Sequence, residues 1–375
     1  MDSSEHGFRM ARRVAVLVLV LALSVVILSP VVVRAPPPPP EWEPRAPMPV
    51  ARAYFGAAEL RGEVYAAGGL VSSPPGVNVT AEMDAYDPAT DRWTRVADLP
   101  EPRWGHVLVS AGDQLYLAGG SSSPFLFDGM ETQVYAYDPT ADTWAPVAAM
   151  PEPRTWAAGF ALGWQVHVWG GSPDGSTAYT DSMFAYDPGM NLWSSGPSMP
   201  FPRSNFAAAV VGDRAYLTGG WRNLSNTTSF RSPTYAWEDL APMIHGRGAH
   251  ASAELGGAVW AIGGVTADTS EYVPSTSVER YDPGTDTWTS QTPYPAAVHS
   301  LSAVRAGTVL YAMGGINEFG SSASLYALIV GSTTPPSPAA FLWLLGALLA
   351  LGVAAVAAFA FFPWRAGRRS PRPPG

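Results

Sequence analysis

Glycine pairs at a regular spacing are the feature of this sequence that most limits its fold. Each pair ends a short apolar run, and successive pairs stand 44 to 51 residues apart. A repeat of this length indicates a structural unit that cannot bury its own apolar face and therefore stacks on its neighbours. The middle of the chain is thus expected to form one repeat structure, with glycine pairs beginning at Gly68, Gly119, Gly170, Gly219, Gly263 and Gly314.

Further residues recur in phase with the glycine pairs. A Tyr-Asp-Pro follows four of the pairs, and a tryptophan stands seven residues after each of these tyrosines. A Leu-Pro or Met-Pro comes next and is usually followed by an arginine. The fourth repeat keeps an aromatic pair alone, Tyr235 and Trp237. The complete copies contain Tyr86 and Trp93, Tyr137 and Trp144, Tyr186 and Trp193, and Tyr281 and Trp288.

This combination resembles the kelch repeat over residues 42–330. The resemblance implies an all-β fold, a β-propeller with one four-stranded blade per repeat. We label the strands of a blade a to d from the centre outward. The apolar run before each glycine pair, such as residues 114–118, is then strand b. The tyrosine and the tryptophan are expected to wedge between blades with their polar atoms hydrogen-bonded.

The number of blades follows from counting the repeat elements. Six glycine pairs are present, but five of them are followed by the tryptophan element, because the last repeat ends near Val330. The missing element stands at the other end, where Trp42 precedes a Met-Pro. We therefore predict a six-bladed β-propeller whose ring is closed by an N-terminal outer strand near Trp42, which serves as strand d of the last blade.

Two uncharged apolar segments flank the repeats. Residues 14–33 and 339–362 are each long enough to cross a hydrocarbon layer of about 30 Å as a helix. Residues 1–13 carry three arginines and residues 363–375 carry four, whereas residues 34–338 hold 15 arginines and 29 acidic residues. The positive-inside rule thus predicts a protein of the cell membrane with both termini cytoplasmic and the propeller extracytoplasmic.

The fate of both apolar segments is left open by the sequence. The first fits either a retained signal anchor or a cleaved signal peptide, although Pro36 disfavours cleavage after Ala35. The second fits a stop-transfer helix or a processed sorting signal. The predicted order is a basic cytoplasmic N-terminus, a membrane helix or anchor, a proline-rich linker, the propeller, a second linker, a membrane helix and a basic cytoplasmic tail, at residues 1–13, 14–33, 34–41, 42–330, 331–338, 339–362 and 363–375.

Composition excludes several classes of function. The sequence has no cysteine, which excludes a disulfide scaffold, a thiolate metal site and a cysteine nucleophile. Its charged fraction is 14% and its formal net charge is −9, which argues against a nucleic-acid partner. The sequence contains no motif for a serine nucleophile elbow, a phosphate loop or a zinc protease. No catalytic residue, cofactor or metal is therefore predicted.

The b–c and d–a connections are expected to carry the binding surface. The c–d turns are short and near-identical, whereas the b–c connections are long and varied, at residues 70–83, 121–133, 172–183, 221–234 and 265–278. Varied loops on a rigid scaffold commonly bind ligands. Both ends of the propeller are expected at a c–d position, so the b–c side is predicted to face away from the membrane.

An arginine stands at five of the six d–a junctions. The resemblance implies that such arginines can lie near the mouth of the central channel, where guanidinium groups would suit carboxylates. The alternative is a structural bond to the backbone of the neighbouring blade. The sixth junction is aligned at Ala296, three residues before His299. The candidate ligand-binding residues are Arg52, Arg103, Arg154, Arg203, Arg247, His106, His250 and His299.

The leading functional hypothesis is a membrane-anchored module that binds an extracellular protein, peptide or glycan. One alternative, implied by the resemblance, is a mutarotase-like enzyme acting on acidic sugars, in which a histidine, Glu101 or Glu152 moves a proton. Another alternative is a structural protein of the cell envelope. Acceptor patterns for glycosylation in the b–c connections stand at Asn78, Asn223 and Asn226.

Overall fold

The computed structural model describes residues 40–330, apart from 74–75, 126–127, 222–223, 233 and 267–272. The predicted membrane segments 14–33 and 339–362, the second linker and both basic tails lie outside the described residues, as does most of the proline-rich linker. Within the part that is described, no helix has the length and apolar character needed to span a bilayer. The described chain folds into β-strands and their connections.

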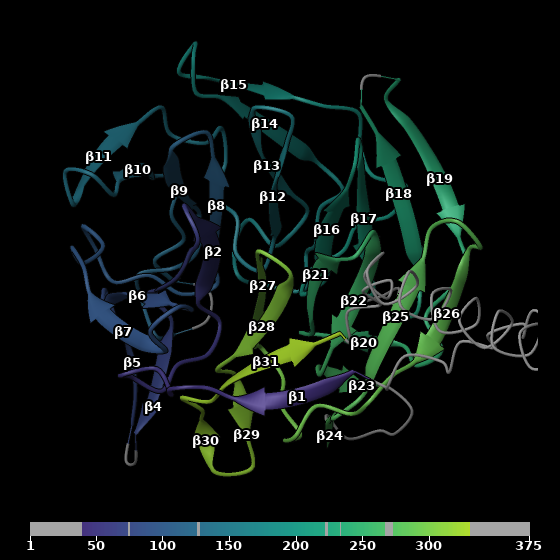
Figure 1. The fold of residues 1–375 in the computed structure, drawn as a ribbon. Helices are drawn as coiled ribbons and strands as arrows, with labels where there is room; N and C mark the ends of the chain where they lie inside the picture. Colours follow the sequence, from purple (N-terminus) through teal and green to yellow (C-terminus); the bar gives the residue numbers. More distant parts are fainter. Residues whose placement is uncertain are drawn as a thin grey trace, which may run out of the picture. The chain divides into compact units, whose positions relative to one another are not determined.

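Six four-stranded antiparallel sheets form the blades (Figure 1). Blade 1 contains β2 (Gly56–Leu60), β3 (Glu63–Ala67), β6 (Met83–Asp87) and β7 (Arg92–Arg95). Blade 2 contains β8 (Val107–Ala111), β9 (Gln114–Ala118), β10 (Val134–Asp138) and β11 (Thr143–Val147). Blade 3 contains β12 (Ala158–Leu162), β13 (Gln165–Trp169), β14 (Met183–Asp187) and β15 (Leu192–Ser195).

The second half of the ring repeats this arrangement. Blade 4 contains β16 (Ala207–Val211), β17 (Arg214–Thr218), β18 (Thr227–Arg231) and β19 (Ala236–Leu240). Blade 5 contains β21 (Ala251–Leu255), β22 (Ala258–Ile262), β25 (Val278–Asp282) and β26 (Thr287–Ser290). Blade 6 contains β27 (Ser302–Ala306), β28 (Val309–Met313), β31 (Leu325–Ile329) and, as its outer strand, β1 (Glu41–Pro44).

The inner strands close the ring of blades. β2 contacts β8, β8 contacts β12, and the contacts continue through β16, β21 and β27 back to β2. β1 pairs antiparallel with β31, so that Glu41 lies opposite Ile329 and Pro44 lies opposite Tyr326. The predicted six-bladed propeller, closed by an N-terminal strand, is therefore confirmed by the sheet topology.

The fourth blade departs from the predicted boundaries. The sequence placed residues 221–234 in a connection, but β18 lies within them. Phe230 stands opposite Trp237, as the repeated tyrosine stands opposite its tryptophan in blade 1. Phe230 is thus the counterpart of that tyrosine, and Tyr235 lies instead in the c–d turn with a φ of 53°. The prediction was wrong here because strand c of this blade is rich in threonine and lacks Tyr-Asp-Pro.

A hydrogen-bonded clamp joins neighbouring blades, as the tyrosine and tryptophan were expected to do. In blade 1, Asp91 Oδ1 accepts hydrogen bonds from the Tyr86 hydroxyl at 2.7 Å and from the backbone N–H of Ala46, just after β1, at 2.9 Å. Trp93 Nε1 donates to the carbonyl of Ala46 at 2.8 Å. Both backbone polar groups of one alanine are thereby held. Equivalent clamps hold Ala97, Ala148 and Ala241.

The boundary between blades 3 and 4 is built differently. Phe230 has no hydroxyl, and Trp237 Nε1 has no hydrogen-bond partner among the described residues. An aromatic cluster occupies this boundary, where the Trp169 ring lies 4.5 Å from Phe160, 5.0 Å from Phe230 and 5.6 Å from Trp237, measured between ring centroids. Apolar burial and edge-to-face contacts thus take the place of the clamp.

The glycine pairs bring adjacent blades into direct backbone contact. Gly119 has a φ of 69°, and a Cβ atom placed on it would lie 2.3 Å from the carbonyl oxygen of Arg154 in the next junction. The next residue, Gly120, donates its N–H to that same carbonyl at 2.6 Å. A side chain at Gly119 would therefore push the two blades apart.

Candidate functional site

The b–c and d–a connections lie on one side of the propeller, because strands alternate in direction within each blade. Three b–c connections extend into small hairpins along the lower edge of Figure 1. They pair β4 (Leu70–Ser73) with β5 (Gly76–Val79), β23 (Val265–Thr266) with β24 (Val273–Pro274), and β29 (Ile316–Asn317) with β30 (Gly320–Ser321). A junction strand, β20 (Arg247–Gly248), also pairs with β23. The start of β1 and the end of β31 lie at the c–d position of blade 6, on the opposite side.

A closed circle of six backbone hydrogen bonds surrounds the channel mouth on the b–c side. Each d–a junction supplies one residue, whose N–H donates to the carbonyl of the equivalent residue in the preceding blade at 2.6 to 3.0 Å. All six have a left-handed backbone, with φ between 50° and 63°. Strained backbone of this kind is often retained at functional sites. The circle borders a hollow of about 130 Å³ and consists of Tyr54, Gly105, Trp156, Asn205, Ala249 and Ser300.

Aromatic side chains cover part of this mouth, and the sequence reasoning missed them. The Tyr54 ring lies edge-on to Trp104 at 5.7 Å, and Trp104 lies edge-on to Trp156 at 5.9 Å, between ring centroids. Trp156 Nε1 has no hydrogen-bond partner in the part of the chain that the structure describes. Burial raises the pKa of Tyr54, which keeps its hydroxyl protonated. The available signal was an aromatic residue one or two places after the junction arginine.

The junction arginines are buried inside the blades rather than exposed at the mouth. Arg52 donates to the backbone carbonyls of Ala66, Gly68 and Glu82 at 2.8 to 3.3 Å and forms an ion pair with buried Asp84 at 2.5 Å. The sequence left open whether these arginines contact a ligand or bond to the backbone. The contacts of Arg52 are those of a structural residue. The same burial holds for Arg103, Arg154, Arg203 and Arg247.

The counterions of these arginines come from two positions. Arg247 pairs with buried Glu279 on strand c, as Arg52 pairs with Asp84. In blades 2 and 3 the acid stands two residues before the arginine instead: Glu101 lies 3.0 Å from Arg103, and Glu152 lies 2.9 Å from Arg154. The two glutamates that the enzyme alternative invoked as acid or base thus serve as partners of buried arginines.

Two of the candidate histidines, His106 and His250, are buried between blades and line the inner part of the hollow at the channel mouth. His106 Nε2 accepts a hydrogen bond from Gly56 N at 3.2 Å, and His250 Nε2 lies 2.8 Å from Thr218 Oγ1. Burial, with a smaller contribution from the adjacent arginine, lowers the pKa of each to about 3. Both are therefore neutral near pH 7. Half-buried His299 lies near the mouth, where its ring centroid is 6.4 Å from that of Tyr54.

The sixth junction was aligned two residues too early in the sequence. The second glycine of each pair donates its N–H to the carbonyl of the next junction residue, which is an arginine in five blades. In the sixth case the acceptor is Val298, at 2.8 Å, rather than Ala296. Leu301, not His299, is therefore the counterpart of His106. The prediction was wrong because the absence of the arginine removed the landmark used for alignment.

Large apolar side chains stand exposed on the b–c and d–a connections. Phe319 is 86% exposed and Phe125 is 72% exposed, both on b–c connections. Val77, Val273 and Ile244 are also exposed on this side. The opposite side exposes as many large apolar side chains, among them Trp164, Met190, Leu192 and Tyr235. What favours an interaction surface on the b–c side is therefore the position of Phe125 and Phe319 on varied loops, and not the number of exposed residues.

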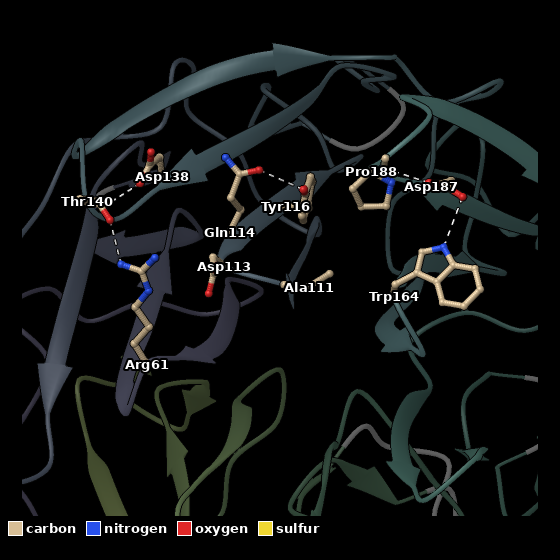
Figure 2. A pocket seen from close by; sticks show the side chains of 12 residues that line it. Arg61, Ala111, Asp113, Gln114, Tyr116, Asp138, Thr140, Trp164, Asp187 and Pro188 are labelled. Carbon is tan, nitrogen blue, oxygen red and sulfur yellow. Dashed lines mark hydrogen bonds between the residues drawn. The ribbon is translucent and has the colours of Figure 1, made fainter.

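A larger hollow, of about 680 Å³, lies on the other side, over the a–b and c–d turns of blades 1 to 3 (Figure 2). Trp164 stands at one edge of it with 70% of its surface exposed, and its Nε1 donates to Asp187 Oδ2 at 3.3 Å. Across the hollow, Arg61 donates to Thr140 Oγ1 at 2.8 Å. Asp113 also lines it. An exposed aromatic face bordered by polar groups is therefore available on this side.

The remaining sequence-based sites are placed as follows. Asn78 is exposed on β5, and Asn226 is half-buried just before β18. Asn223 lies outside the described residues. Within the described ranges, no group of three or more histidine and acidic side chains is arranged to hold a metal ion.

Comparisons with known proteins agree with this geometry. A model of the kelch motif matches residues 51–100, 102–151 and 246–293. Kelch-like protein 34 of Homo sapiens is 33% identical over 233 residues, which cover 58% of this chain and 35% of that protein. Kelch-like protein terF of Aspergillus terreus is 27% identical over 306 residues, which cover 79% of this chain and 56% of that protein. Beta-scruin of Limulus polyphemus is 29% identical over 149 residues, which cover 38% of this chain and 16% of that protein.

Among solved structures, that of YjhT superposes with a TM-score of 0.67 at 17% sequence identity. The superposition covers 77% of this chain and 98% of YjhT, and it supports the propeller fold. The chain spans less than two thirds of the length of the curated relatives that it matches.

Proposed function

The chain is a kelch-repeat protein, and on this premise we propose that its propeller is a protein-interaction module. The proposed binding surface is the loop rim, which we define by the exposed apolar residues of the b–c and d–a connections: Val77, Phe125, Ile244, Val273 and Phe319. The exposure of Phe125 and Phe319 carries this proposal, because burying the apolar surface of a phenylalanine in a protein interface lowers the free energy of the complex.

The channel mouth would form the centre of the same surface. Tyr54 and Trp156 are half-buried there, and Trp156 keeps an indole N–H without a partner among the described residues. Aromatic residues with one polar atom are enriched among the side chains that contribute most to protein binding. A partner that covers the loop rim would also cover the exposed parts of these two rings.

The direction of the chain ends supports display of this surface. The described chain begins and ends at paired strands of blade 6, on the side away from the loop rim. In our proposal the apolar segments 14–33 and 339–362 hold the chain at a membrane, so that the loop rim faces away from that membrane.

A peptide-display experiment tests the module directly. Peptides selected from a random library on the purified full chain should bind the loop rim. In the double variant Phe125→Ser, Phe319→Ser their affinity should fall at least about tenfold, since each lost aromatic anchor commonly costs more than 1 kcal/mol. The variant Leu192→Ser, which removes an exposed apolar residue at the c–d side, should bind them as the native chain does. Loss of binding in Leu192→Ser with full binding in the double variant would refute the assignment.

A second candidate, glycan binding, is favoured by the hollow beneath Trp164. Its exposed indole offers a flat apolar face for a sugar ring, and Asp187 and Asp113 offer acceptors for hydroxyl groups. Because several carboxylates line the hollow, we propose neutral rather than acidic sugars as ligands.

Calorimetric titration of the full chain with a panel of neutral and acidic oligosaccharides would test this second proposal. A neutral sugar should bind, and Trp164→Ala should weaken it at least about tenfold, as loss of an aromatic contact of this size implies. The control Met190→Ala removes another exposed apolar side chain near the same turns and should leave the affinity unchanged. Binding of acidic sugars alone, or of none, would exclude the proposed site.

A further inference from the structure

Arg203 in blade 4 is a buried cation whose guanidinium group forms no hydrogen bond with any described residue. Its relative exposure is 0%, and none of its three guanidinium nitrogens has a hydrogen-bond partner among the described residues. The hydroxyl oxygen of Thr228, on strand c of the same blade, is also buried and has no hydrogen-bond partner among the described residues. Its guanidinium carbon lies 5.6 Å from the centroid of the Phe206 ring. A buried charge that lacks hydrogen bonds is costly, so this cluster calls for a physical explanation.

The other four junction arginines each have a carboxylate within 3.0 Å. In blades 2 and 3 it comes from the residue two places before the arginine, and in blades 1 and 5 from strand c. Blade 4 has Phe201 at the first of these positions and Thr228 at the second. Neither residue can supply the carboxylate whose negative charge pairs with the guanidinium group in those four blades.

Strand register shows that Thr228 stands where the carboxylate would be. Thr228 pairs with Leu217 on strand b, in the same register in which Glu279 pairs with Ala261 in blade 5. Because directly opposite residues share one face of a sheet, Thr228 and Glu279 point the same way within their blades. Thr228 therefore directs its hydroxyl towards the space that a glutamate or aspartate occupies elsewhere.

The remaining charge near Arg203 does not replace that carboxylate. Asp239 lies opposite Thr228 on β19 and is exposed to solvent. Burial lowers the pKa of Arg203 to about 10, and the negative charge of Asp239 opposes this effect only in part. Arg203 thus remains positively charged near pH 7.

We propose that blade 4 binds a small monovalent anion, of the size of chloride, between the guanidinium group of Arg203 and the hydroxyl of Thr228. The anion supplies the negative charge that Asp84 and Glu279 supply in blades 1 and 5. The complete burial of Arg203 restricts the ligand to a small ion, since a peptide or sugar carboxylate could not reach it. Thr228 would gain an acceptor for its unpartnered hydroxyl group.

Thermal unfolding of the purified full chain in sodium chloride and in sodium gluconate, at one ionic strength, tests the site. Chloride should raise the melting temperature by a few degrees with a saturable dependence, because an ion that binds the folded state alone stabilises it by mass action. Gluconate is too large to enter a buried site. Equal melting temperatures in the two salts would overturn the proposal.

Two variants and one control locate the effect. Thr228→Glu installs the carboxylate of blade 5, so it should raise the melting temperature in gluconate and remove the dependence on chloride. Arg203→Met should remove that dependence as well. The control Thr94→Glu adds the same charge at an exposed position of β7 and should respond to chloride as the native chain does. A chloride response that persists in Thr228→Glu would place the ion elsewhere and refute the site.

Discussion

Replacing Gly119 with alanine should destabilise the propeller more than any surface substitution, by roughly 3–5 kcal/mol. About 1–2 kcal/mol comes from holding an alanine at a left-handed φ. The rest comes from the new Cβ atom, which would lie 2.3 Å from the carbonyl oxygen of Arg154. That carbonyl is held by the N–H of Gly120, so it cannot move without breaking a bond between blades.

Gly112→Ala is the matched control for this substitution. Gly112 has a similar φ of 60°, but a Cβ atom there would meet nothing within 4 Å. Its replacement should therefore cost the backbone strain alone, about 1–2 kcal/mol. Chemical unfolding of both variants measures the difference. Similar losses in the two would show that contact between blades at the glycine pair does not limit stability.

Acid should destabilise the protein because two histidines are buried without charge. The pKa of His106 and of His250 is about 3 in the folded state, against about 6.5 for an exposed histidine. The unfolded chain therefore binds more protons between these values, and stability falls as the pH falls from about 6.5 towards 3. At pH 5 the two histidines together should cost roughly 4 kcal/mol, which is a large part of the stability of an ordinary domain.

The double variant His106→Phe, His250→Phe tests this acid effect. Phenylalanine fits the position in principle, since Phe55 and Phe206 occupy the equivalent places in blades 1 and 4. The variant loses the hydrogen bond from Gly56 and is expected to be less stable at pH 7. Its free energy of unfolding should nevertheless vary less between pH 6.5 and pH 4 than that of the native chain. An unchanged pH dependence would show that other groups control the acid transition.

The sequence predicted the repeated parts of the fold because each repeated residue has one geometric task. The tyrosine and tryptophan of blade 1 converge on Ala46, and the glycine pair admits a neighbouring carbonyl. Even the closing strand at Trp42 was recognisable, since it carries the element that the last repeat lacks. Residues of this kind can be read from spacing alone, because any other side chain would disturb the contact.

The errors arose where one repeat replaced such a residue. In blade 4 the phenylalanine at position 230 keeps the apolar contact but loses the hydrogen bond, so strand c was hidden. At the sixth junction, Val298 keeps the backbone contact without the arginine. In both cases the structural contact is made by the backbone or by apolar surface, so it survives the substitution. The sequence motif, which depends on the identity of the residue, does not.

The candidate site was less predictable than the fold for a different reason. Whether an arginine reaches solvent or bonds the neighbouring backbone depends on a few ångströms of depth, which spacing does not encode. The same holds for Tyr54, Trp104 and Trp156, whose grouping arises from three separate blades. Their convergence exists once the ring has closed and has no counterpart in any single repeat.

The closing strand also determines how the propeller would respond to force. Residues 40 and 330 leave blade 6 side by side, with Glu41 directly opposite Ile329. A force applied through both residues would not stretch all hydrogen bonds of the β1–β31 ladder at once. It would break them one pair at a time, beginning with the pair Glu41 and Ile329. Release of β1 would then expose β31 as an unpaired edge. The strand that completes the ring at rest would thus be the first part to yield under tension.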